Sequence, residues 1–399
     1  MDGDARGGVV RGDVAAGFEP VAAEFARLLA DAGPGGGGEA GGQFCAYAGG
    51  QLVADLWAGP DVTADDLQGV FSSTKGAAAV CVALLVQRGA LDLDATVSRY
   101  WPEFAGGGKG GVTVRLALSH QAGVPGVEPQ LDFDQIIQHD LVAARLAAQV
   151  PHWRPGAAHG YHGLTIGTII DELVRRVAGQ PAAEFFAAEV AGPRGIDFYI
   201  RTPPEVEPRV RPLLPARPPA GAPAAGAPAA GPPPAGPPPA GPDSLAGMTF
   251  NLAARPADDL LPNIRAFRAS GQAAAAGTGS ARGLARLYAM CIAEVDGFPR
   301  LLTEATVAQF SQVQAVGHDL VLRVPTRFGV VFQKADDRTP FGSHQAFGHD
   351  GAGGCLGFAD PWHDIAYAWI PRRMSFPAGA DPAGLSLARV LRACRPGRP

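Results

Sequence analysis

The chain has 399 residues, 47% hydrophobic and 18% charged, which is long enough for one large or two medium domains and unlike a disordered protein. Its net charge of −5 gives no basic surface for nucleic acid, so we expect no nucleic-acid partner. It contains no apolar run of the roughly 18 residues that a membrane helix needs. The N-terminal residues lack the apolar segment of a secretory signal, so we expect no membrane association and a cytoplasmic location.

The cysteines and glycines also exclude several kinds of site. Five cysteines are scattered without paired spacing, which predicts reduced thiols and not a disulfide framework or a zinc site. No cluster of His, Cys or carboxylate residues suggests a metal. The glycine-rich stretches 33–42 and 106–111 lack the strand-to-helix context of a phosphate-binding loop. We therefore expect neither a metal nor another cofactor.

The first part of the chain predicts a helix, a hairpin and a second helix. Apolar residues at helical spacing predict the first helix over 18–32. Two strands follow, Gln43–Ala48 and Gln51–Ala58, on either side of a tight turn at Gly49-Gly50. Residues 72–88 are nearly all apolar, so this segment predicts a buried helix.

The middle of the chain predicts mostly helix. Helical patterns occur at 114–118, 164–177 and 181–190, and strand character is weak between about 100 and 285. Residues 203–242 differ, because Ala-Gly-Ala-Pro and Ala-Gly-Pro-Pro-Pro units repeat from 218 to 242 without apolar periodicity. We expect a flexible, polyproline-biased loop, interpreted as a tolerated surface insertion; a role in binding a partner stays open.

The C-terminal part again predicts strands. The expected elements are a helix at 283–295, short strands at 328–333, 345–349, 355–360 and 365–370, and a helix at 385–393. Strands at both ends of the chain predict an α+β fold, in which one antiparallel sheet is assembled from both termini. We expect residues 1–100 and 285–399 to form this part, and residues 101–284 to form a mostly helical part.

Ser72-Ser73-Thr74-Lys75 stands at the start of the predicted buried helix. A serine and a lysine three residues apart project from the same helix face, so the amine can lie beside the hydroxyl. A lysine in a desolvated pocket can share the serine proton and so activate a nucleophile. The alternative is a helix-capping serine followed by a solvated lysine, and spacing alone does not separate the two.

Two further segments add to this pattern. Trp153–Gly163 places Tyr161 just before a predicted helix, and Phe347–Phe358 is a strand with small residues around His349. Together with Phe71–Gly76, these segments resemble the serine β-lactamase and penicillin-binding-protein superfamily, specifically its class C-like branch of family VIII esterases and related transacylases. The segments that also resemble this branch are 89–97, 113–123 and 279–288. The proline-rich repeat has no counterpart in it.

The resemblance implies a β-lactamase/transpeptidase-like fold and a role for each matching residue. Ser72 would attack an acyl carbonyl to give an acyl-enzyme, and Lys75 would ease its ionisation and hold the phenol of Tyr161. Tyr161 would be the general base toward Ser72 and later the acid toward the leaving group, which requires Lys75 to lower the phenol's pKa. The backbone amides of Ser72 and Ala352 would form the oxyanion hole.

The same resemblance predicts a substrate pocket. His349 and Gly351 would line it, since a small residue lets an edge strand approach a substrate. His162 and Gly163 would lie in the same pocket, where Gly163 would open space beside Tyr161 for water or a larger acceptor.

Neighbouring polar residues have structural interpretations. We expect Ser73 and Thr74 to be helix-start hydroxyls, Ser119-His120 to form a turn, and Trp153 to serve packing.

Two departures from the superfamily pattern decide the functional prediction. Gly163 stands where β-lactamases and peptidases use an asparagine to orient substrate amides, and His349 stands where a lysine binds the carboxylate of penicillins and peptidoglycan stems. We therefore expect a serine acyl hydrolase acting on a small ester, ahead of a β-lactamase or D,D-peptidase. A transacylase of specialised (antibiotic) metabolism, with an amine or alcohol acceptor, is the alternative, because acceptor choice depends on pocket shape and water exclusion. A silent binding domain of this fold is a third possibility.

Overall fold

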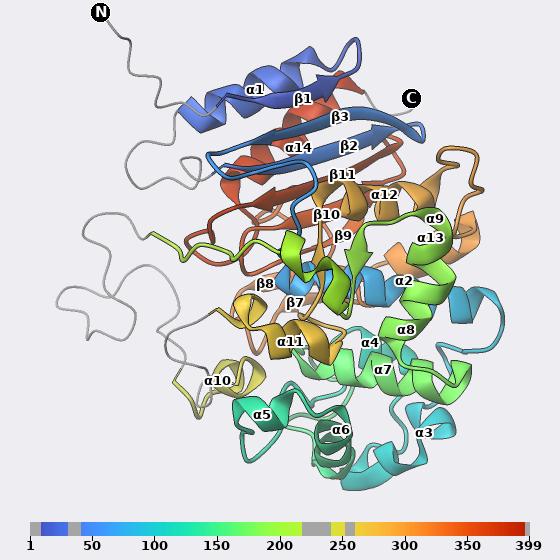
Figure 1. The fold of residues 1–399 in the computed structure, drawn as a ribbon. Helices are drawn as coiled ribbons and strands as arrows, with labels where there is room; N and C mark the ends of the chain where they lie inside the picture. The colour runs from blue at the N-terminus through green and yellow to red at the C-terminus, as the bar shows by residue number, and fades with distance from the viewer. Residues whose placement is uncertain (1–8, 31–40, 218–240, 252–259, 396–399) are drawn as a thin grey trace, which may run out of the picture.

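The computed structural model describes residues 9–30, 41–217, 241–251 and 260–395 (Figure 1). The predicted flexible repeat, apart from its last two residues, lies outside these described residues. None of the described helices is long and apolar enough to span a membrane. All five cysteines are free thiols, as their spacing predicts.

The main sheet combines strands from both ends of the chain. Its six strands run in the order β1-β3-β2-β11-β10-β9, and every neighbouring pair is antiparallel. The strands are β1 Arg11–Val14, β2 Gly42–Ala48, β3 Gln51–Ala58, β9 Phe347–Asp350, β10 Leu356–Asp360 and β11 Ile365–Pro371. The register of β2 on β11 sets Phe44 opposite Trp369. The predicted α+β fold, with one antiparallel sheet built from both termini, is therefore confirmed.

Helices cover both faces of this sheet, which explains why β2 and β11 are buried along their whole length. On one face lie α1 (Glu19–Ala30) and α14 (Pro382–Cys394), and on the other lies α12 (Ala281–Ile292) (Figure 1). The apolar side of α1 meets the sheet, where the Phe25 and Trp369 ring centroids are 5.7 Å apart.

The helical region lies beneath the sheet in Figure 1, around α2 (Thr74–Gln87). Residues 74–85 of α2 are all buried, and the helix packs against α7 (Thr165–Ala178) and α13 (Glu304–Ser311). The surrounding helices are α3 Val97–Tyr100, α4 Val114–Leu118, α5 Phe133–Ile136, α6 His139–Ala148, α8 Ala182–Phe185, α9 Gly192–Arg194, α10 Leu245–Thr249 and α11 Arg265–Ser270. One apolar core runs from α2 into α7 and α8, across the predicted domain boundary, and the division itself stays a prediction.

Short 3₁₀ and π turns and minor strands complete the fold. The turns are η2 Phe71–Ser73, η3 Pro102–Gly108, η4 Phe186–Ala191, η5 Pro204–Arg209 and η7 Leu261–Asn263. One small sheet joins β4 Gln68–Gly69, β6 Thr278–Gly279 and β5 Phe198–Tyr199, and another pairs β7 Ala315–His318 with β8 Pro325–Phe328.

Two predicted elements differ from the structure. The strand predicted over 328–333 is wrong: β8 ends at Phe328, and the apolar run after it is a buried turn in which Val331 has a φ of 66°. The turn closes with a hydrogen bond from Gly329 N to Phe332 O, so burial in a turn explains the apolar pattern. Strand pairing resumes only at Gln333, which bridges to Gly348 of β9. The helix predicted over 181–190 divides into α8 and the π-helical turn η4.

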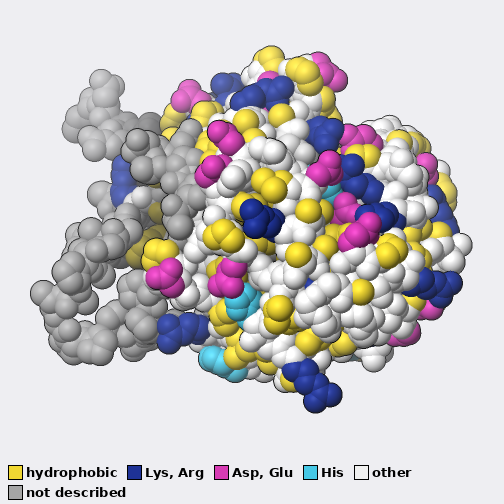
Figure 2. Space-filling view, turned by 90° about the horizontal axis from the view of Figure 1, so that it is seen from below, with side chains coloured by type: hydrophobic (Ala, Val, Ile, Leu, Met, Phe, Trp, Pro, Cys, Tyr) yellow, Lys and Arg dark blue, Asp and Glu magenta, His cyan; other side chains and the backbone are white. Residues whose placement is uncertain are grey.

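On the face shown in Figure 2, basic and acidic side chains lie side by side, and the described residues form no continuous basic patch there.

Candidate active site

Ser72 lies in η2, the turn that leads into α2. The preceding residue, Phe71, has a φ of 49°, a left-handed conformation that is uncommon for a bulky side chain. Thr74 Oγ1 donates a hydrogen bond of 2.5 Å to Phe71 O and so fixes the turn. Ser72 is half-buried, whereas Lys75 is completely buried one turn later. The predicted helix-start role of Thr74 agrees with these contacts.

Lys75 Nζ has three polar neighbours. It lies 3.1 Å from Ser72 Oγ, 2.8 Å from Gly163 O and 3.1 Å from Ala274 O. Burial lowers the pKa of Lys75 to about 7, and the negative charge of Asp350 opposes this shift only in part. Because a carbonyl only accepts, a neutral amine donates its two N–H groups to the carbonyls and turns its lone pair to Ser72. An ammonium donates to all three neighbours, so both protonation states are satisfied.

Tyr161 is on the loop before α7 and reaches the same serine. Its hydroxyl donates a hydrogen bond of 2.8 Å to Ser72 Oγ. Lys75 Nζ lies over the face of the Tyr161 ring, 4.9 Å from its centroid. Burial raises the pKa of Tyr161, and the hydrogen bond to Ser72 offsets this only in part. The predicted lowering of this pKa is wrong for this structure, because Tyr161 lies in an apolar cluster.

The β9 strand and the loop after it lie against the turn that carries Ser72. Ser73 Oγ donates to His349 O over 3.1 Å, so its hydroxyl ties the start of α2 to β9. A Cβ at Gly351 would lie 2.2 Å from Val70 O, so only glycine allows this approach. The two segments that contain the amides of Ser72 and Ala352 are therefore adjacent.

Two predicted pocket histidines are buried and neutral. His349 Nδ1 donates to Asp350 O over 2.7 Å, while its Nε2 has no partner among the described residues. Burial and the neighbouring Lys75 charge lower the pKa of His349 to about 3. His162 Nδ1 donates to Gly160 O over 2.7 Å, and its Nε2 accepts from Val124 N over 3.2 Å. Both ring nitrogens of His162 are therefore hydrogen-bonded to backbone groups, and its place in the substrate pocket stays a prediction.

Gly163 does not open space beside Tyr161 as predicted. A Cβ at Gly163 would lie 2.8 Å from Thr249 Cγ2 and 3.3 Å from Phe250 Cε1, so residues of α10 and the position after it fill this space. Phe250 also packs near Tyr161, with ring centroids 6.2 Å apart. Close packing therefore requires glycine at position 163, and the carbonyl of Gly163 accepts a hydrogen bond from Lys75.

The sequence reasoning missed Asp319, which holds the Tyr161 loop. Its buried Oδ1 accepts hydrogen bonds from the backbone amides of Tyr161 at 3.1 Å, Val321 at 2.9 Å and Leu322 at 2.8 Å. Oδ2 accepts from Thr326 Oγ1 over 3.2 Å. Asp319 stands alone in an unpatterned segment, so no sequence signal distinguishes it from a surface aspartate.

His120 is a second missed residue. Ser119-His120 forms the predicted turn, but the imidazole of His120 is buried behind Tyr161, with ring centroids 5.1 Å apart. His120 Nδ1 accepts a hydrogen bond of 3.0 Å from His162 N. Its unusual φ of 64° is a property of the fold that the sequence pattern does not indicate.

Within the described ranges, no group of three or more His, Cys, Asp or Glu side chains is arranged to hold a metal ion. The arrangement around Ser72 instead suits acyl transfer, because one hydroxyl has an amine and a phenol within hydrogen-bonding distance.

Comparison with known proteins agrees with this fold. The sequence model of the family described as Beta-lactamase matches residues 25–390. The esterase/beta-lactamase LipL of Mycobacterium tuberculosis is 31% identical over 349 residues, which are 84% of this chain and 78% of LipL.

Two solved structures superpose closely on this one. EstA from Arthrobacter nitroguajacolicus has a TM-score of 0.86 at 39% identity, covering 96% of this chain and 98% of EstA. A family VIII carboxylesterase has a TM-score of 0.83 at 31% identity, covering 97% of this chain and 100% of that one. This chain therefore belongs to the beta-lactamase family and is a carboxylesterase-like hydrolase within it.

Proposed function

We propose that this protein is a serine carboxylesterase that hydrolyses small esters through an acyl-enzyme on Ser72. The observation that carries the proposal is the position of Ser72 Oγ, 3.1 Å from Lys75 Nζ and 2.8 Å from the Tyr161 hydroxyl. The esterase names of LipL and of the family VIII carboxylesterase support the choice of an ester substrate.

In the first half-reaction, neutral Lys75 takes the proton of Ser72 as Oγ bonds to the acyl carbon. A pKa of about 7 suits a general base at neutral pH. The amides of Ser72 and Ala352 stabilise the oxyanion. The ester C–O bond then breaks, and the Tyr161 phenol donates its proton to the departing alkoxide. The acyl-enzyme holds a Lys75 ammonium and a Tyr161 phenolate, whose charges stabilise each other.

In the second half-reaction, the Tyr161 phenolate takes a proton from water, and the hydroxide formed attacks the acyl carbon. When the bond between Ser72 Oγ and the acyl carbon breaks, the Lys75 ammonium returns its proton to Ser72. In this order of steps, Tyr161 acts as a base only in deacylation. This fits the raised pKa of Tyr161, because the phenol is protonated in the resting enzyme.

The substrate we propose is a small, uncharged ester. His349 stands in place of a carboxylate-binding lysine, and with a pKa of about 3 it is neutral at pH 7. Asp350, the next residue, has a raised pKa through burial but is still an acidic group. Neither residue attracts an anionic substrate. We further propose a cytoplasmic location, where free thiols remain reduced.

Transfer of the acyl group to an amine or alcohol is a second candidate. Tyr161 lies in an apolar cluster with Ala246, Val321 and Phe328, against which Phe250 packs. Such surroundings exclude water and would slow hydrolysis of the acyl-enzyme, leaving time for another acceptor.

A fluorophosphonate probe tests the proposal. It should form one covalent adduct, located on Ser72 by peptide mass spectrometry, and should abolish turnover of p-nitrophenyl butyrate in proportion to labelling. Ester turnover without an adduct on Ser72 would contradict the mechanism, and a lack of both reactions would favour a silent binding domain.

A further inference from the structure

The orientation of Lys75 depends on two backbone carbonyls from distant segments. Gly163 O lies before α7, and Ala274 O lies in the loop that follows α11. If either carbonyl moved, the amine would lose a hydrogen-bond acceptor, and its lone pair would no longer point to Ser72. Whatever joins these two segments therefore controls the proton transfer.

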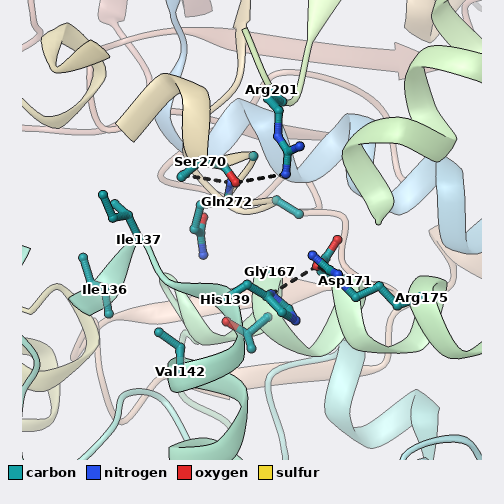
Figure 3. Close-up of a pocket in the computed structure, with 13 residues that line it drawn as sticks. Ile136, Ile137, His139, Val142, Gly167, Asp171, Arg175, Arg201, Ser270 and Gln272 are labelled. Atoms are coloured by element: carbon teal, nitrogen blue, oxygen red, sulfur yellow. Dashed lines mark hydrogen bonds and ion pairs between the residues drawn. The ribbon is translucent and has the colours of Figure 1, made fainter. Parts of the chain in front are cut away.

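The side chain of Gln272 joins them. Its Nε2 donates to Leu164 O over 2.7 Å, and its Oε1 accepts from Ala274 N over 2.9 Å. Leu164 follows Gly163 directly, so each hydrogen bond holds a peptide group next to one of the two carbonyls. Gln272 lies in the wall of the cavity in Figure 3, beside Gly167 of α7.

Close packing at Gly167 shows how tightly this loop is seated on α7. A Cβ at Gly167 would lie 2.6 Å from Ala274 N and 2.9 Å from Gln272 Nε2. The loop is also fixed at its other end, where Gly277 N donates to Thr74 Oγ1 over 2.9 Å. The segment 272–277 is thus held between α7 and the start of α2, with the carbonyl that binds Lys75 in its middle.

We propose that Gln272 is a positioning residue for the proton transfer between Ser72 and Lys75. This inference rests on the proposed function, since it concerns the activation of the same serine. Gln272 touches neither substrate nor Ser72; it acts by holding the carbonyls of Gly163 and Ala274, which orient the Lys75 amine.

The test measures the rate of fluorophosphonate labelling of Ser72, together with kcat and KM for p-nitrophenyl butyrate. Gln272→Ala should slow labelling and lower kcat by about tenfold or more, with KM within about twofold, because a misplaced catalytic group costs rate and not substrate affinity. Labelling within about twofold of the wild-type rate would overturn the proposal while leaving the esterase mechanism intact.

Gln149 offers a matched control. Like Gln272 it is half-buried and bridges backbone groups, donating to Gly126 O over 2.8 Å and accepting from Glu128 N over 2.9 Å. Gln149→Ala should lose similar hydrogen bonds but keep the wild-type labelling rate. Equal slowing in both variants would mean general loosening of the fold and would overturn the positioning role.

Gln272→Glu keeps the test decisive if the alanine variant fails to fold. A protonated glutamic acid can still donate to Leu164 O and accept from Ala274 N, whereas an ionised one cannot donate. The ratio of variant to wild-type kcat should therefore be near one at low pH and fall as pH rises through the carboxyl pKa. A ratio independent of pH would contradict the positioning role.

Discussion

Lys75 and Lys109 are both completely buried, and each lies over an aromatic ring, yet only one is in the candidate active site. Lys109 Nζ donates to three backbone carbonyls, those of Gly106, Ala147 and Gln149. For Lys75, one of the three neighbours is the hydroxyl of Ser72 in place of a carbonyl.

This one difference separates a structural lysine from a candidate base. Burial lowers the pKa of both, to about 8 for Lys109 and about 7 for Lys75. A carbonyl has no proton to give, so Lys109 only links chain segments, whereas Ser72 can pass its proton to Lys75. The rings differ in the same way, since Phe104 under Lys109 carries no hydroxyl and Tyr161 under Lys75 does. A perturbed lysine pKa is therefore not by itself a sign of catalysis.

Removing the Ser72 hydroxyl, which lies beside Lys75 and has no counterpart beside Lys109, should have the largest effect on turnover. Ser72→Ala should lower kcat for p-nitrophenyl esters by about 10³-fold or more and abolish acyl-enzyme adducts, because no other group can attack. Steady-state kinetics and intact-protein mass spectrometry measure both. Ser73→Ala is the control and should lower kcat at most several-fold, since the Ser73 hydroxyl only bonds to the backbone of β9. If Ser72→Ala kept more than about a hundredth of the wild-type activity, Ser72 would be excluded as the nucleophile.

Tyr161→Phe makes the ring under Lys75 resemble the one under Lys109. Without the phenol, the leaving group receives no proton, and kcat should fall by about 10²- to 10⁴-fold with little change in KM. Lys75→Ala should have a similar effect. The double variant should be little worse than either single one, because both residues act in the same acylation step at Ser72 and the loss of either leaves little for the other to contribute. Additive losses in steady-state assays of all three variants would contradict this joint action.

The pH dependence of the reaction separates the two lysines again. The neutral form of Lys75 is the proposed base, and its pKa is about 7, so kcat/KM should rise with pH and level off above about pH 7. Below that pH, kcat/KM should fall about tenfold per pH unit as the ammonium form accumulates. Initial rates between pH 5 and 9 measure the profile. A profile that rose only near the pKa of a phenol would identify Tyr161 as the base in acylation.

The sequence predicted the parts of this site that lie within short motifs. Helical spacing paired Ser72 with Lys75 but did not separate catalysis from helix capping, and the resemblance of short motifs to the superfamily added the roles of both residues and of Tyr161. The residues that hold the site in place come from segments distant in the chain. Asp319 bonds to the backbone of Tyr161, and Thr249 packs against Gly163. Such contacts form only when the fold brings the segments together, and no local periodicity announces them.

The fold was predicted well where burial follows a regular period. The hairpin of β2 and β3 was correct because its strands flank a two-glycine turn. The strand predicted over 328–333 was wrong because an apolar run looks the same in a buried turn and in a buried strand. Lys109 lies in a glycine-rich stretch, and from the sequence we concluded only that this stretch is not a phosphate-binding loop. The structure shows that three backbone carbonyls, one of them Gly106 O, surround the Lys109 amine, and no sequence pattern predicted this.

Lys109→Met should affect turnover least. The methionine fills a similar volume but leaves the carbonyls of Gly106, Ala147 and Gln149 without their donor, which should destabilise the fold by about 1–3 kcal/mol. Thermal unfolding should show this as a lower Tm, while kcat per folded molecule and the pH profile stay as in the wild type, since Lys109 is bonded only to backbone. Lys75→Met is the matched comparison, because it removes the same type of buried amine but leaves Ser72 without a base. If Lys109→Met also lowered kcat at temperatures well below its Tm, the third partner would not be what separates the two lysines.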